Sequence, residues 1–157
     1  MRKKFGRKQK GMVDVGTKSV TKRTAIASAT ITMSKQAFQA LIHGDSPKGN
    51  VFETAKVAGV MAAKSTPHII PLCHPLELTK VQVDFETFPR KCSVTIRAEV
   101  QCLGRTGVEM EALTACSIAA LTIYDMMKWA GQDMRMTDIQ LLEKHGGKSG
   151  SYVFQKS

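Results

Sequence analysis

The sequence is poor in the features that define several common classes of protein. Aromatic residues make up 6% of its 157 positions, with a single tryptophan, and no uninterrupted apolar run approaches the length of about 18 residues that crosses a membrane. The phosphate-binding patterns G-x-G-x-x-G and G-x-x-x-x-G-K-[ST] are both missing. These absences argue against a membrane protein, a nucleotide-binding loop of the two commonest kinds, and an RNA-binding sheet with stacked aromatic residues.

The four cysteines, Cys73, Cys92, Cys102 and Cys116, form neither a zinc pattern nor a disulfide framework, because no two are spaced as C-x-x-C. Cys73 beside His74 is a weak candidate metal pair, since adjacent residues rarely point at one ion and no further ligand pair is found. No apolar segment follows the basic start, so no secretory signal is expected. Reduced thiols in a cytoplasmic protein are the expectation.

Positive charge is concentrated at the start of the chain. The formal net charge is +10, and six of the 23 basic residues lie within residues 1–10, which contain no acidic residue. We expect residues 1–11 to form a basic, disordered head, with weak contact to nucleic acid as the alternative. The chain is 43% hydrophobic and of a length that fits one domain, so residues 12–157 are expected to form a single catalytic domain.

Hydrophobic periodicity predicts one order of elements. Strands are expected at residues 25–33, 81–86, 94–102 and 134–143, and helices at residues 35–43, 51–64 and 108–130. Pro67 is expected to stop the second helix. The third is apolar on most sides, so it should be buried on more than one face, by a sheet and with another subunit as the candidate for the rest. The order predicts an α+β fold of the ferredoxin-like split β-α-β kind, with an antiparallel sheet and helices packed on one face.

Three side chains in this pattern could move protons. Asp125 and Lys128 are three residues apart on the long helix and face the same side. Asp125 follows a mostly apolar stretch, which makes it a candidate general base with a pKa tuned by Lys128; a simple helix ion pair is the alternative. His74 lies between two prolines and could donate to a phosphate or carry a proton, or it could be a core histidine that caps a carbonyl.

Other residues suit the binding of an anion. Lys48 precedes a glycine at the start of a helix, where backbone N–H groups and the helix dipole favour phosphate, although an ordinary turn would look the same. Lys144 and the glycines of residues 146–150 could form an anion cradle or a flexible tail. Glu109 and Glu111 enter the first turn of the long helix, where they complement its dipole or reach a site, but their spacing of two should keep them off a common face.

Several segments of the chain, taken together, resemble one family. They are Met12–Val15 (MVDV), Lys48-Gly49, Ala58–Val60, Ala62–Lys64, Ile70–Leu76 (IPLCHPL), Thr106–Thr114 (TGVEMEALT), Leu121–Met126 (LTIYDM) and Gly146–Gly150 (GGKSG). The chain resembles the cyclic pyranopterin monophosphate synthases of molybdenum cofactor biosynthesis from about Met12 to Gly150. The loop around His74 and the TGVEMEALT run are the most specific parts of the match.

The resemblance implies a reaction and an assembly. The substrate would be an anionic, cyclised dihydroguanosine triphosphate supplied by a radical enzyme, and the products cyclic pyranopterin monophosphate and pyrophosphate. The enzyme would be a cytoplasmic lyase with neither a metal nor an organic cofactor. It would form a homohexamer, a trimer of dimers, with sites at subunit interfaces, and neither a membrane nor nucleic acid is implied as a partner.

The resemblance also implies roles for individual residues. Asp125, Lys128 and Lys48 match the catalytic residues. The matching substrate-binding residues are Leu72, Cys73, His74, Met110, Glu111, Glu109, Arg23, Lys64 and Lys144, of which the three basic ones would hold the phosphates or the base. The chain departs from the family in having Asn50 where Asp is usual and Met127 where Cys is usual, and Asn50 removes a charge beside Lys48.

Overall fold

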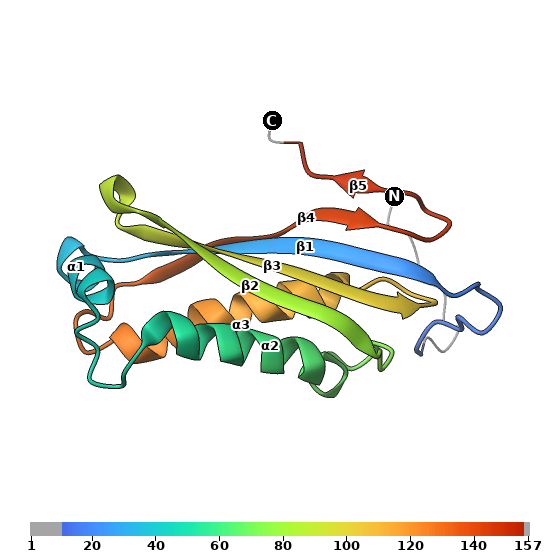
Figure 1. Cartoon of the computed structure of the whole chain (residues 1–157), viewed down its shortest axis with the longest axis horizontal. Helices are drawn as coiled ribbons and strands as arrows, with labels where there is room; N and C mark the ends of the chain where they lie inside the picture. Colours follow the sequence, from blue (N-terminus) through green and yellow to red (C-terminus); the bar gives the residue numbers. More distant parts are fainter. Residues whose placement is uncertain (1–10, 156–157) are drawn as a thin grey trace, which may run out of the picture.

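A five-stranded antiparallel sheet forms one layer of the molecule, and two long helices cover one of its faces (Figure 1). The computed structural model describes residues 11–155. The elements are β1 (Thr21–Thr32), α1 (Lys35–His43), α2 (Val51–Ile69), β2 (Leu78–Phe88), β3 (Ser93–Gly104), α3 (Glu109–Met127), β4 (Arg135–His145) and β5 (Tyr152–Val153). The sheet order β2-β3-β1-β4-β5 confirms the predicted α+β, ferredoxin-like split β-α-β fold.

Strand β1 is the centre of the sheet and fixes which loops meet. It pairs with β3 along its whole length, with Thr21 opposite Gly104, and on its other side Thr24 lies opposite His145 of β4. The antiparallel register therefore brings three segments to one end of the molecule: the chain that precedes β1, the connection from β3 to α3, and the glycine-rich loop after β4.

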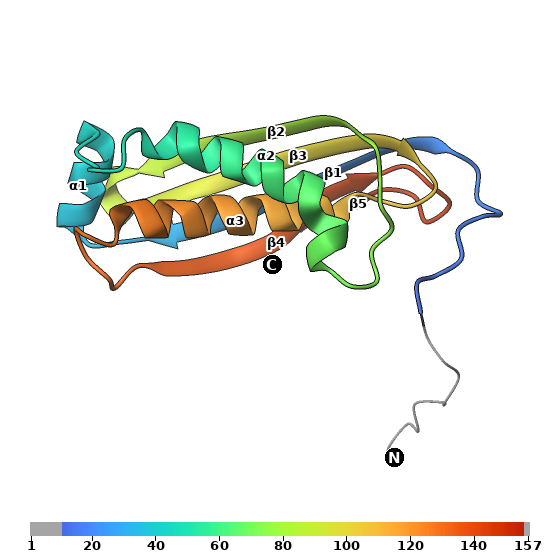
Figure 2. The same cartoon turned by 90° about the horizontal axis from the view of Figure 1, so that it is seen from below.

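Helix α3 packs against the sheet and, side by side, against α2, which confirms its predicted burial by a sheet; its burial by a second subunit stays a prediction. Ile123 is fully buried, and burial of such a side chain contributes about 1.5–3 kcal/mol. Ala115 and Ala119 of α3 meet α2 at Gly59. A Cβ added at Gly59 of α2 would lie 3.1 Å from the carbonyl oxygen of Ala115, so the two helices pack closely (Figure 2).

The prediction that Pro67 stops the second helix is wrong, because α2 continues to Ile69. Pro67 has no N–H to donate to the carbonyl of Ala63, but it lies in the last turn, where one missing bond costs little. The N–H of Ile70 still donates to the carbonyl of Thr66 at 2.8 Å and closes the helix.

Other boundaries also differ from the prediction. β1 starts at Thr21 rather than at residue 25, and α3 ends at Met127, where the N–H of Ala130 donates to the carbonyl of Met127 at 2.9 Å and turns the chain. β5 was not predicted. Most of the expected basic head lies outside residues 11–155. In that described part, no helix is long and apolar enough to cross a membrane.

Candidate active site

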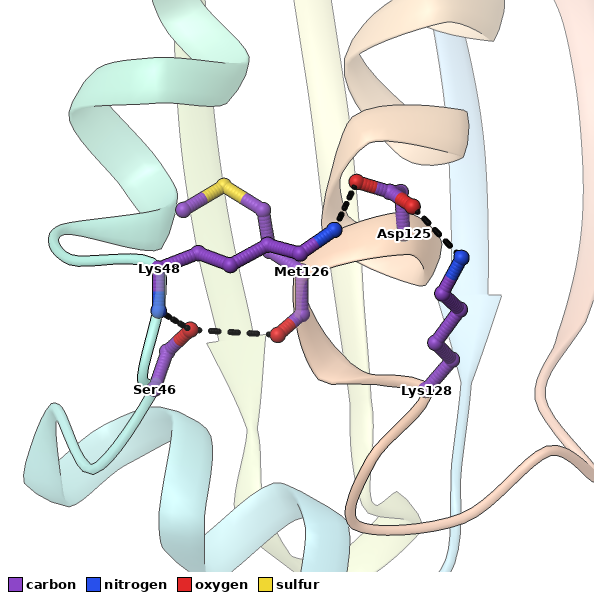
Figure 3. A network of polar contacts seen from close by, with 5 residues as sticks. All are labelled: Ser46, Lys48, Asp125, Met126 and Lys128. Atoms are coloured by element: carbon purple, nitrogen blue, oxygen red, sulfur yellow. Dashed lines mark hydrogen bonds and ion pairs between the residues drawn. The ribbon is translucent and has the colours of Figure 1, made fainter.

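A carboxylate held between two ammonium groups lies at the C-terminal end of α3 (Figure 3). The Nζ atom of Lys128 is 2.8 Å from Oδ1 of Asp125, and the Nζ atom of Lys48 is 2.6 Å from Oδ2. Lys128 directly follows α3 along the chain, whereas Lys48 comes from the loop between α1 and α2. Each carboxylate oxygen therefore has its own cation. We call these three residues the acid–base cluster.

The two lysines stabilise the charged form of this carboxylate. Hydrogen bonds from Lys128 and then from Lys48 lower the pKa of Asp125 from 3.8 to about 2, and the same contact raises the pKa of Lys128. The Asp125 side chain is 51% exposed, so the cluster is open to solvent in the single chain. At neutral pH the cluster presents one base and two acids within hydrogen-bond reach of each other.

Ser46 joins the loop of Lys48 to the helix of Asp125. Its hydroxyl donates to the carbonyl of Met126 at 3.1 Å and accepts the backbone N–H of Lys48 at 3.2 Å (Figure 3). The carbonyls of the last helical turn have no partner within the helix, so this contact also satisfies one of them. Ser46 is 9% exposed, and it ties the backbone of Lys48 to the turn that carries Asp125.

Asn50, where the family usually has Asp, begins α2. Its Oδ1 atom accepts the backbone N–H of Glu53 at 3.1 Å, which is the usual contact of an N-cap residue. An Asp side chain would make the same cap. Lys48, two residues before Asn50, already has the Asp125 carboxylate as its partner.

A cation-lined cavity lies at the opposite end of α3, where the segments around the start of β1 meet. Its volume is about 490 Å³. The lining includes five basic side chains and the first residues of the glycine-rich loop: Lys18, Arg23, Arg105, Lys144, Lys148, Gly146 and Gly147. We call it the basic cavity. A concentration of cations of this kind suits a ligand with several negative charges.

Arg23 is the most buried of these cations, at 8% exposed. Its Nε donates to the carbonyl of Gly104 at 3.2 Å and its Nη1 to the carbonyl of Gly146 at 3.3 Å. A Cβ at Gly147 would lie 1.8 Å from Nη1, so a larger residue there would displace the guanidinium. No carboxylate within residues 11–155 forms an ion pair with Arg23. A buried charge without a counter-ion is costly, and a bound anion would relieve that cost.

A second cavity of about 430 Å³ adjoins the first and is less basic. Its lining brings together the two sequence segments predicted to contact substrate: Leu72, Cys73, His74, Glu109, Met110 and Glu111. We call it the mixed cavity. Glu109, which lines both cavities, pairs with Lys144 at 2.9 Å and stands between them.

Glu111 contributes a buried carboxyl group to the mixed cavity. The side chain is 3% exposed, and burial, followed by the charge of Glu109, raises its pKa. Burial and then the charge of Glu111 raise the pKa of the Cys73 thiol. Glu109 and Glu111 were expected to lie off a common face of the helix, yet both line the mixed cavity, which lies at the N-terminal end of α3.

The structure thus places the predicted site residues in two groups within one chain. Asp125 comes fourteen positions after Glu111 on α3, which corresponds to about 21 Å along the helix axis. Lys64 belongs to neither group, because it lies exposed on α2 and lines neither cavity. Within residues 11–155, no group of three or more His, Cys, Asp or Glu side chains is arranged to hold a metal ion.

Sequence reasoning missed several residues of these groups. Ser46 and Arg105 act on backbone carbonyls, which carry no sequence signal. Lys18 and Lys148 line the basic cavity. Lys148 lies within the GGKSG segment and could have been found there, whereas Lys18 has no motif around it.

An acid–base cluster and a basic cavity on a split β-α-β sheet are the features that an enzyme for a small anionic substrate would need. The profile of the MoaC family matches residues 12–147, and the chain belongs to this family.

Three curated relatives show how similar the chain is in sequence to other proteins of this kind. The chain is 53% identical over 142 residues to a cyclic pyranopterin monophosphate synthase of Desulfatibacillum aliphaticivorans, covering 90% of this chain and 89% of the relative. It is 51% identical over 142 residues to the synthase of Campylobacter lari, with 90% of both chains covered. It is 54% identical over 141 residues to the synthase of Methylobacterium nodulans, covering 90% of this chain and 88% of that one.

Proposed function

We propose that this protein is a cyclic pyranopterin monophosphate synthase of molybdenum cofactor biosynthesis. It converts a cyclised dihydroguanosine triphosphate into cyclic pyranopterin monophosphate and releases pyrophosphate. The observation that carries the proposal is the acid–base cluster: in a chain of this family, Asp125 holds one lysine ammonium on each carboxylate oxygen. Residues 12–157 form the catalytic domain, and the enzyme works in the cytoplasm beside the radical enzyme that supplies its substrate.

The stoichiometry defines the bonds that change. A triphosphate that becomes a cyclic monophosphate plus pyrophosphate must form a bond from one of its own hydroxyl oxygens to the α-phosphorus while the α–β anhydride bond breaks. This makes the enzyme a phosphorus–oxygen lyase. The hydroxyl must lose a proton, and the rearrangement of the purine ring needs further proton transfers. A carboxylate with two adjacent ammonium groups can accept and return these protons without a metal or organic cofactor.

The two cavities suit the two ends of such a substrate. The basic cavity receives the phosphates, since Arg23 and Lys144 offer N–H donors to phosphate oxygens. The mixed cavity receives the base. A guanine-derived edge presents N–H donors, and the buried carboxyl of Glu111 and the imidazole of His74 can bond to it. Lys64, on the exposed side of α2, reaches the substrate only from a neighbouring chain.

A shared site follows from the separation of the two groups. Asp125 and Glu111 are about 21 Å apart along α3, too far to act on one base and its sugar. We propose that the acid–base cluster of one subunit closes over the cavities of another, in a homohexamer built as a trimer of dimers. The exposure of Asp125 in the single chain agrees with a position at such an interface.

The test of the function is turnover of the authentic cyclic triphosphate by the full-length chain. We expect equal amounts of pyrophosphate and of the pterin product, the latter measured by fluorescence after oxidation. A folded, assembled protein that releases neither product from authentic substrate would overturn the proposal.

Replacement of Arg23 by Gln is expected to weaken binding of inorganic pyrophosphate by about 10- to 100-fold, because a hydrogen bond to a charged group contributes about 1.5–3 kcal/mol. Isothermal titration calorimetry measures this directly and needs no turnover. Arg90→Gln, an exposed arginine in the turn between β2 and β3, is the matched control and should bind pyrophosphate as the unaltered chain does. If both variants bound pyrophosphate with equal affinity, Arg23 would not be part of the phosphate site.

A further inference from the structure

The segment that precedes β1 forms part of the wall of both cavities. Residues 11–20 contain neither helix nor strand. Val13 and Val15 line the mixed cavity, and Lys18 lines both cavities. Two local contacts shape the segment: the Asp14 carboxylate accepts the N–H of Gly16 at 2.8 Å, and the N–H of Lys18 donates to the carbonyl of Val15 at 3.0 Å.

Arg105 fastens this segment to the body of the protein. It directly follows β3, and its Nη1 donates to the carbonyl of Lys18 at 2.8 Å and also to the carbonyl of Gly16. In the described part of the chain, the other hydrogen bonds of residues 13–18 are internal to the segment. The polar tie between this wall and the β3–α3 connection is therefore a single guanidinium.

The position of Arg105 connects the tie to the substrate cavities. The two residues that follow it, Thr106 and Gly107, line both cavities, and Arg105 itself lines the basic one. A guanidinium carries several N–H donors in a rigid plane, so one side chain can hold two carbonyls and fix the turn between them. Without it, the segment would have to be ordered each time a ligand bound, at a cost in conformational entropy.

We propose that Arg105 is a positioning residue for substrate binding, which acts by holding residues 13–18 so that Lys18, Val13 and Val15 complete the walls of the two cavities. This inference rests on the proposed function for its substrate. Because Arg105 bonds to the carbonyls of Gly16 and Lys18 and not to the acid–base cluster, it acts on KM and leaves the chemical step unchanged. Pre-ordering of a wall contributes equally to binding of the ground state and the transition state.

The experiment compares the unaltered full-length chain with Arg105→Gln, Arg105→Lys and the control Arg90→Gln. Hydrogen exchange without substrate reports on the segment alone. We expect the two hydrogen-bonded amides of the segment, those of Gly16 and Lys18, to exchange about 10-fold faster in Arg105→Gln, with no change in α3, since loss of the tie permits local opening. With substrate, KM should rise about 10-fold while kcat stays within about 2-fold. Arg105→Lys keeps a donor and should recover part of both effects.

A double-mutant cycle with Lys18→Met separates positioning from direct contact. If Arg105 acts through the segment, removal of the Lys18 ammonium takes away part of what Arg105 positions, and the two changes in KM combine to less than their product. If Arg105 only contacts the substrate itself, the two changes multiply, and the proposal is wrong.

The remaining outcomes are equally decisive. Unchanged exchange of the Gly16 and Lys18 amides in Arg105→Gln would overturn the proposal, and so would faster exchange with an unchanged KM. If the unaltered chain has no turnover, the proposed function is wrong, and the role of Arg105 is tested separately. The cycle is then measured as the affinity for inorganic pyrophosphate, where multiplied effects again overturn the positioning role and effects below the product support it.

Discussion

Asp125→Asn is expected to lower kcat by about 10²- to 10⁴-fold, the range that a positioned acid–base group contributes. The amide keeps the shape of the carboxylate but is not a base, and it presents an NH₂ group to one of the two ammonium groups that the carboxylate accepts. Steady-state turnover of the cyclic triphosphate, followed by pyrophosphate release, measures the loss. The thermal midpoint should change little because Asp125 is an exposed residue.

Asp133→Asn is the matched control for this change. It makes the same substitution at an exposed residue in the turn after α3 and should retain full activity. A folded Asp125→Asn protein that turns over at the rate of this control would exclude Asp125 from the chemistry.

Two inactive variants are expected to restore each other when their chains are mixed. Asp125→Asn removes the acid–base group, and Glu111→Gln removes the buried carboxyl of the mixed cavity, about 21 Å away along α3. If each site takes one group from each of two chains, a random equal mixture gives both intact groups in about a quarter of the sites. Refolding the two variants together and measuring turnover per chain tests this, against each variant refolded alone.

A second arm of this experiment places both mutations on the same chain. The double variant Asp125→Asn/Glu111→Gln, mixed equally with unaltered chains, should also leave about a quarter of shared sites intact. If each chain instead held a complete site, this mixture would keep about half of the activity and the two single variants would give none. That second pair of results would contradict a site built between subunits.

The fold could be predicted because its elements repeat local patterns over many residues. The alternation of β3 and the apolar surface of α3 extend over 12 and 19 residues, and such signals persist when single boundaries shift. β5 could not be predicted, since it consists of Tyr152 and Val153 alone.

The site was predictable where its residues are close in sequence. Asp125 and Lys128 are three apart, and helical geometry alone brings them together. Lys48 joins them from 77 residues away, and only the family resemblance placed it there. The division of the residues into two groups could have been read from the length of α3, because a rise of about 1.5 Å per residue separates the ends of any such helix.

The place of α3 between the two groups has a consequence for the assembly as a whole. Every chain carries an acid–base cluster at one end of this helix and a pair of cavities at the other, so each chain has two halves to match. An open row of subunits would leave an unmatched half at each of its ends, whereas a closed ring or a two-fold pair leaves none. In the proposed shared site, closure therefore sets the number of working sites equal to the number of chains, and we expect dilution to monomers to remove the activity completely.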